Sequence, residues 1–196
     1  MEIKRPKISC VIPIHDMKNG DFFLTRLINS LLKQTYKDFE VVITKQGRMA
    51  ENTNAAIKKA KGELVKVLYM DDYLIDEDGL KKMVTAFDTN PDFHWLIAGA
   101  DNNPFPMWTD DIETGNNRLG SPSALMFRNG VDVLFDENMS WLLDCDLYRR
   151  LCDKYRYPLI LEGAYIGIGV GDHQMTNILT EIDKLSEFNY LKKKHE

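Results

Sequence analysis

Two adjacent carboxylates, Asp71 and Asp72, directly follow an apolar segment at residues 63–70. Neighbouring like charges repel each other and add nothing to a hydrophobic core, so their place at the end of a buried strand needs a cause. One interpretation is a solvated turn, where carboxylates are common. The other is a site for a hard divalent cation, which prefers carboxylate oxygens as ligands. These residues alone leave both interpretations open.

Other side chains with useful chemistry lie further along the chain. His173 follows glycines at 167, 169 and 171, and its imidazole is an acceptable ligand for Mn²⁺, although a lone histidine is more often a surface or capping residue. Trp108 and Trp141 offer indole faces that could pack on a sugar ring, but tryptophan is equally common in cores and at their rims. Position in the fold must decide between these roles.

The composition limits the class of protein. The chain has 196 residues, 44% of them hydrophobic and 28% charged, which is enough for one well-buried core. A net charge of -5 with scattered cations argues against nucleic acid as a partner. No apolar run approaches the ~18 residues of a transmembrane segment, and no signal peptide is evident. Three cysteines without metal-site spacing are typical of free thiols, so we expect a cytoplasmic protein.

Strand-like and helix-like segments alternate along the chain. Apolar, β-branched runs predict strands at 7–14, 39–44, 63–70, 93–99 and 124–128. Apolar residues at helical spacing predict helices at 21–35, 52–62, 76–87, 141–155 and 173–188. In the last of these, Ile178, Ile182 and Leu185 are expected to point inward, and the basic run 191–196 to form a frayed, solvated tail. The alternation predicts an α/β fold with a mostly parallel central sheet flanked by helices.

The order of elements also predicts where a ligand would bind. In such sheets ligands lie beyond the carboxyl ends of the strands, where residues 71–72 and 15–16 are found. Residues 101–123 form a long segment rich in Asn, Asp, Pro and Gly, and long loops inside compact domains are usually functional. Residues 119–123 fit either the wall of a cleft or a plain turn.

Four segments in this order resemble a known family. They are "ISCVIPIHD" (8–16), "LINSLLKQTYKDFEVVI" (27–43), "NTNAAIKKAKGELVKVLYMDDYL" (52–74) and "FDENMSWLLDCDLYRRL" (135–151). The chain is similar in them to the inverting glycosyltransferases of the GT-A fold, family 2 type. The resemblance implies a Rossmann-like GT-A domain, with a nucleotide-sugar-binding half (1–100) and an acceptor-binding half (101–196). Because the chain stops soon after the matched segments, we expect a single minimal domain over 1–196, with no appended domain or membrane helix.

The resemblance implies roles for several carboxylates. Asp72 would coordinate Mn²⁺ or Mg²⁺, and Asp71 would contact the ribose or a metal-bound water. Such a cation neutralises the negative charge that develops on the diphosphate leaving group. His173 would be a late metal ligand. The acceptor hydroxyl needs a base, which the resemblance puts at Asp144, with Asp146, about half a helical turn away, as the alternative.

The resemblance also implies binding residues, and here the sequence departs from the family. Donor contacts fall on Pro13, His15, Thr44, Arg48 and Asn52, besides the two aspartates, and Trp141 and Trp108 are candidate acceptor platforms. The family usually ends its second strand with an aspartate that reads uracil, but this chain has Thr44. Leu143 stands where the family usually has a glutamate beside the base. Either Thr44 and backbone groups read the base, or the nucleotide is not uridine.

The sequence thus predicts a metal-dependent inverting glycosyltransferase of the hexosyltransferase type. It would move a sugar from a nucleoside-diphosphate donor, UDP-sugar first, to a glycan or lipid-linked acceptor, as in polysaccharide biosynthesis. One alternative is a non-catalytic relative that binds a nucleotide sugar or glycan. Another is a sugar-1-phosphate nucleotidyltransferase, which would want a Gly-rich basic loop after the first strand, and "IPIHDMKNGD" is a poor one.

Overall fold

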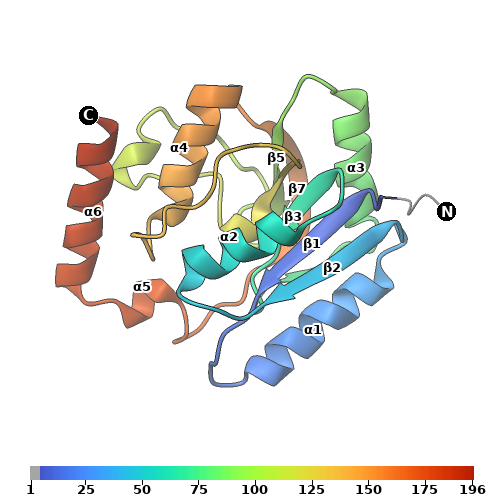
Figure 1. The fold of residues 1–196 in the computed structure, drawn as a ribbon, viewed down its shortest axis with the longest axis horizontal. Coiled ribbons are helices and arrows are strands. Elements are labelled where there is room, and N and C mark those ends of the chain that lie inside the picture. Colours follow the sequence, from blue (N-terminus) through green and yellow to red (C-terminus); the bar gives the residue numbers. More distant parts are fainter. Residues whose placement is uncertain (1–4) are drawn as a thin grey trace.

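One seven-stranded sheet forms the centre of the computed structural model, which describes residues 5–196 (Figure 1). Its spatial order is β2-β1-β3-β6-β5-β7-β4. Strands β1, β2 and β3 are parallel, as are β5 and β7, whereas β6 and β4 pair antiparallel with their neighbours. The strands are β1 (Ile8–Pro13), β2 (Phe39–Thr44), β3 (Leu64–Val67), β4 (Tyr73–Leu74), β5 (Trp95–Ala100), β6 (Leu125–Arg128) and β7 (Leu159–Gly167). The predicted α/β sheet is confirmed.

Helices cover both faces of the sheet. They are α1 (Gly20–Lys33), α2 (Met49–Lys59), α3 (Gly79–Thr89), α4 (Leu143–Tyr155), α5 (Met175–Ile178) and α6 (Glu181–His195), with 3₁₀ turns at Ile112–Thr114 and Pro122–Ala124. Side chains of α1 and α3 share one buried cluster, and those of α2 and α4 share the other. Helix α6 stands beside α4 at the edge of the molecule (Figure 1).

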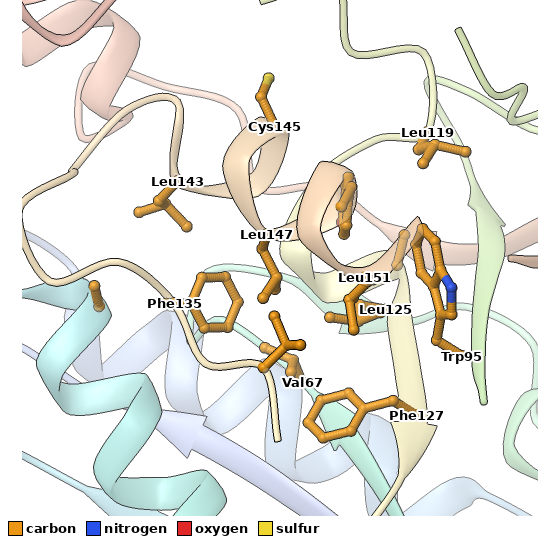
Figure 2. Packing of buried hydrophobic residues seen from close by; sticks show 14 of the residues in the cluster. Val67, Trp95, Leu119, Leu125, Phe127, Phe135, Leu143, Cys145, Leu147 and Leu151 are labelled. Carbon is orange, nitrogen blue, oxygen red and sulfur yellow. The ribbon is translucent and has the colours of Figure 1, made fainter. Parts of the chain in front are cut away.

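The two clusters follow from the alternation of side chains along each strand. In β1, Cys10 and Ile12 join the α1–α3 cluster, while Val11 between them joins the α2–α4 cluster. Figure 2 shows the second cluster, in which Leu147 and Leu151 of α4 pack toward Val67 and Leu125 of the sheet. Removing one such leucine side chain would cost about 2–5 kcal/mol, so this packing determines which face of α4 points away from the sheet.

The sheet contains two strands that the sequence analysis did not predict, β4 and β7. Strand β3 ends at Val67, three residues before the predicted boundary, and residues 68–72 form a turn. The chain then pairs again as β4, only two residues long, antiparallel to β7. Because β7 comes about 85 residues later, this pairing has no local signal.

The predicted helix at 173–188 is instead two helices. Thr180 separates α5 from α6, and its hydroxyl accepts a hydrogen bond from the Asp183 amide in a capping box. This break changes the phase of the helix, so the expected inward orientation is wrong. Ile178, Ile182 and Leu185 are 57%, 81% and 60% exposed.

The predicted frayed tail is also wrong. Helix α6 continues to His195, and Leu191 is completely buried. Lys194 Nζ lies 2.5 Å from Asp136 Oδ2 and 2.7 Å from Asp146 Oδ1, so ion pairs hold the end of the helix against α4. Among residues 5–196, no helix has the length and apolar character needed to cross a membrane.

Candidate active site

A cleft of about 290 Å³ lies beyond the carboxyl end of β3. It combines residues from distant parts of the chain, because the sheet brings the ends of β1 and β3 together with the start of α4 and the segment after β7. Its lining includes His15, Asp71, Asp72, Trp141, Asp144 and His173. The structure therefore brings six of the sequence-predicted site residues to one cavity.

The two adjacent aspartates differ in environment. Asp72 is 3% exposed, and its Oδ1 accepts a hydrogen bond from the Gly169 amide at 2.8 Å. Burial, with the neighbouring charge of Asp71, raises the pKa of Asp72 to about 7. Asp71 is paired with His173, whose Nε2 lies 3.0 Å from Asp71 Oδ2. The turn therefore holds two carboxylates in close repulsion at the cleft.

This donor set fits a divalent cation. A hard cation would relieve the repulsion between Asp71 and Asp72, and His173 adds an imidazole beside them. Within residues 5–196, no group of three or more His, Cys, Asp or Glu side chains is arranged around a common point. Asp72, with Asp71 or His173, would thus supply only some of the ligands of the ion. Such an incomplete set suits a site where a diphosphate supplies further oxygens.

Asp144 lies in the first turn of α4 and faces the same cleft. Its Oδ2 accepts a hydrogen bond from Asn117 Nδ2 at 2.8 Å, and its Oδ1 accepts one from the Cys145 amide at 2.8 Å. Burial raises the pKa of Asp144 to about 6. A carboxylate with a raised pKa is a stronger base than a solvated one and is still ionised at neutral pH. These properties suit general base chemistry.

Asp146, the alternative base, is not part of the cleft. Its side chain is completely buried and pairs with Arg150 at 2.5 Å, with Lys194, and with His195 at 3.0 Å. Burial raises its pKa, but the pairing with Arg150 and Lys194 holds the pKa of Asp146 below its ordinary value. The side chain thus joins α4 to α6, and sequence spacing could not separate this role from that of Asp144.

The donor contacts predicted at the ends of β1 and β2 and in α2 lie outside the cleft. Pro13 and Thr44 are buried at the paired ends of β1 and β2, and Thr44 Oγ1 donates to the Asn52 carbonyl. Asn52 is 3% exposed. Its Nδ2 donates to the Ile14 carbonyl and its Oδ1 accepts from the Gln46 amide, so the side chain links the loops after β1 and β2. None of the three lines the cleft, because their polar atoms are used within the fold.

Arg48 and Trp108 also lie elsewhere. Arg48 Nη2 donates to the Glu137 carbonyl at 2.6 Å. The Trp108 indole packs edge-on against Tyr157 and donates to Asp110 Oδ1, so it is not available as an acceptor platform in this cleft. Trp141 does line the cleft, and its Nε1 donates to Thr176 Oγ1 at 3.1 Å.

Several site residues were not identified individually in the sequence. Asn117 supports Asp144 from the long loop, and Ser123 supports the aspartate turn by accepting from the Tyr69 amide at 2.8 Å. Ser121 and Pro122 line the cleft, so the 119–123 segment is a wall of it. The asparagine-rich composition of the loop was the one available indication, but it did not identify which residue faces the base.

Glu187 of α6 holds the start of α4 in place. Its carboxylate accepts from the amides of Ser140, Trp141 and Leu142 at 2.5–2.6 Å. These amides have no partner within the helix, and the positive end of the helix dipole favours a carboxylate there. We expect Glu187→Gln to lower the free energy of unfolding by about 1–3 kcal/mol in urea titrations, because one carboxylate oxygen is replaced by a donor. Glu181→Gln on the same helix is the control, and because its side chain is 88% exposed it should lower stability by no more than about 0.5 kcal/mol.

Comparison with family models gives no match, and comparison with curated proteins also gives none. Solved structures do match. Staphylococcus aureus TarS (residues 1–349) is 21% identical, with a TM-score of 0.68 over 83% of this chain and 60% of that one. Its complex with UDP-GlcNAc gives 19% identity and a TM-score of 0.69 over 95% and 65%.

A second similar structure is the mannosyltransferase PcManGT from Pyrobaculum calidifontis in complex with GDP-Man and Mn²⁺. It is 13% identical, with a TM-score of 0.70 over 98% of this chain and 65% of that one. This chain thus spans 60–65% of the length of these solved chains. At such low identity the likeness bears on architecture, and the architecture is clear. The chain has the GT-A glycosyltransferase fold.

Proposed function

We propose that this chain is a metal-dependent inverting glycosyltransferase of family 2 type that uses a nucleoside-diphosphate sugar. The observation that carries the proposal is the meeting of the Asp71–Asp72 pair and Asp144 in one cleft of a GT-A fold. The aspartate pair suits a cation with a diphosphate, and Asp144 suits a base for the acceptor. The complexes of the similar structures, with UDP-GlcNAc and with GDP-Man and Mn²⁺, add support.

Each residue has a defined part in this reaction. Asp144 takes the proton of the acceptor hydroxyl, whose oxygen attacks the anomeric carbon. The bond from that carbon to the diphosphate breaks on the opposite face, and the diphosphate leaves with the electron pair. A divalent cation held with Asp72 would supply neutralisation of the leaving diphosphate. His15 and Trp141, which line the cleft, are proposed contacts for the donor and the acceptor sugar.

The donor nucleotide is proposed as UDP, with GDP as the second choice. TarS is solved with UDP and UDP-GlcNAc, whereas PcManGT is solved with GDP-Man. The acceptor is proposed as a glycan or lipid-linked hydroxyl. The position of Thr44, buried and bonded to Asn52, leaves no carboxylate at the end of β2 to read uracil, so the base must be tested directly.

Calorimetric titration of UDP, GDP and dTDP, each with Mn²⁺ and with EDTA, tests the proposal. We expect one nucleotide to bind at least tenfold more tightly with Mn²⁺ than with EDTA. In a separate turnover assay, the protein should then release that nucleotide from the corresponding nucleotide sugar. Binding without release would favour the non-catalytic relative. Absence of metal-dependent binding for all three nucleotides would contradict the proposed donor site.

A further inference from the structure

Two side chains of helix α1 form hydrogen bonds with the backbone of the turn that carries Asp71 and Asp72. Arg26 Nη2 donates a hydrogen bond to the Asp71 carbonyl at 2.5 Å. Ser30, one helical turn further along the same face of α1, accepts one from the Leu74 amide at 3.0 Å. The backbone of residues 71–74 is therefore held at both ends by a single rigid helix.

An aromatic cluster holds the Arg26 guanidinium in place. Its Cζ lies 4.2 Å from the centroid of the Tyr73 ring and 5.4 Å from that of Phe23, both within the range of cation–π attraction. The Phe23 ring also packs against the His173 ring, with centroids 4.9 Å apart. One cluster thus contacts the carbonyl of Asp71 and the imidazole that pairs with its carboxylate.

Arg26 is not placed for maximal stability. Among residues 5–196, its buried Nε has no hydrogen-bond partner, and an unsatisfied buried donor is unfavourable. A local cost of this kind is expected where a residue serves a site rather than the fold alone.

The opposite side of the turn is closed by glycines. A Cβ at Gly169 would lie 2.2 Å from the Asp71 carbonyl oxygen, and one at Gly167 would lie 2.4 Å from the Tyr73 ring. The turn is therefore enclosed between α1 and the end of β7.

We propose that Arg26 is a positioning residue for the aspartate pair. By fixing the Asp71 carbonyl, it keeps the carboxylates of Asp71 and Asp72 oriented toward the cleft. The inference rests on the proposed function, because the oriented carboxylates are those assigned to the cation and the donor diphosphate. Arg26 itself does not line the cleft.

The test is calorimetric titration of UDP, with Mn²⁺ and with EDTA, into the wild type, Arg26→Met and Arg26→Lys. Lys33→Met is the matched control, since Lys33 is an exposed cation of α1 that, like Arg26, lines a groove between α1 and β4, outside the cleft. We expect Arg26→Met to weaken UDP binding about tenfold with Mn²⁺ and to leave binding in EDTA unchanged, as removal of a group that supports a metal ligand does. Arg26→Lys should recover part of the loss, because lysine keeps the charge without the planar fork. Lys33→Met should match the wild type.

Two results would overturn the inference. One is wild-type affinity with Mn²⁺ in Arg26→Met, and the other is an equal loss with and without the metal. If the wild type itself shows no metal-dependent UDP binding, the proposed donor site fails separately. Amide hydrogen exchange of residues 70–75 then decides the role of Arg26. Faster exchange confined to this segment in Arg26→Met supports positioning, and unchanged exchange overturns it.

Discussion

Replacing Asp144 with asparagine is expected to lower the rate of nucleotide release from the sugar donor by about 10²–10⁴ while preserving nucleotide affinity. The reason is that Asp144 is the cleft carboxylate assigned to proton removal, whereas the donor is assigned to the Asp71–Asp72 turn. Release of the nucleotide diphosphate measures turnover, and calorimetry measures affinity. A variant with full turnover would exclude Asp144 as the base.

The pH profile provides a second readout of the same residue. A general base must be ionised, and the pKa of Asp144 is raised to about 6. At saturating Mn²⁺ and donor, where the bound cation would keep Asp72 ionised, the wild-type kcat should therefore rise with pH through about 6 and level off above it. A flat profile between pH 5 and 7 would contradict this assignment.

Asp146→Asn is the matched control, since it makes the same change two residues further along α4. Asp146 pairs with Arg150, Lys194 and His195. Its loss should lower the free energy of unfolding by about 1–3 kcal/mol, because Arg150 and Lys194, whose side chains are 26% and 27% exposed, lose a buried charged partner. The folded variant should keep its turnover number. The pair of variants separates a base from a structural ion pair.

Asp72→Asn is expected to abolish the metal-dependent part of nucleotide binding, a loss of about 100-fold or more in affinity, equivalent to ~2.7 kcal/mol. The neutral amide is a weaker ligand for a hard cation and cannot neutralise it. Calorimetric titration with Mn²⁺ and with EDTA measures the effect, which should vanish in EDTA.

The same substitution should stabilise the protein without ligands. It removes a buried charge beside the half-buried Asp71, while the side-chain oxygen can still accept from the Gly169 amide. Loss of function together with gained stability is typical of a site residue. Asp76→Asn, on the same segment but paired with Lys82 outside the cleft, should leave metal-dependent binding unchanged. Equal losses in the two variants would contradict a specific role for Asp72.

Local pattern was sufficient for most of the architecture. The β-branched runs at Ile8–Pro13 and Phe39–Thr44 and the apolar spacing of α1 are properties of short segments, so they could be predicted from the sequence. The sequence predicts Asp71 and Asp72 directly after a strand, whereas β3 ends at Val67, four residues before Asp71. Fold class could therefore be predicted from short segments, but the metal role of the aspartate pair came from the resemblance to the family and stays a prediction.

Contacts between distant segments could not be predicted in this way. Asp144 and Asp146 differ by about 200° around α4, and it is the packing of Leu147 and Leu151 onto the sheet that turns the first toward the cleft and the second toward α6. Local pattern likewise gave no sign that Thr44 would be used inside the fold or that Lys194 would pair across the C-terminal helix. The sequence by itself determined the fold class and which carboxylates are candidates for the site. Which of them share one cleft depends on side-chain packing and pairing between elements far apart in the chain, and those interactions exist only in the folded protein.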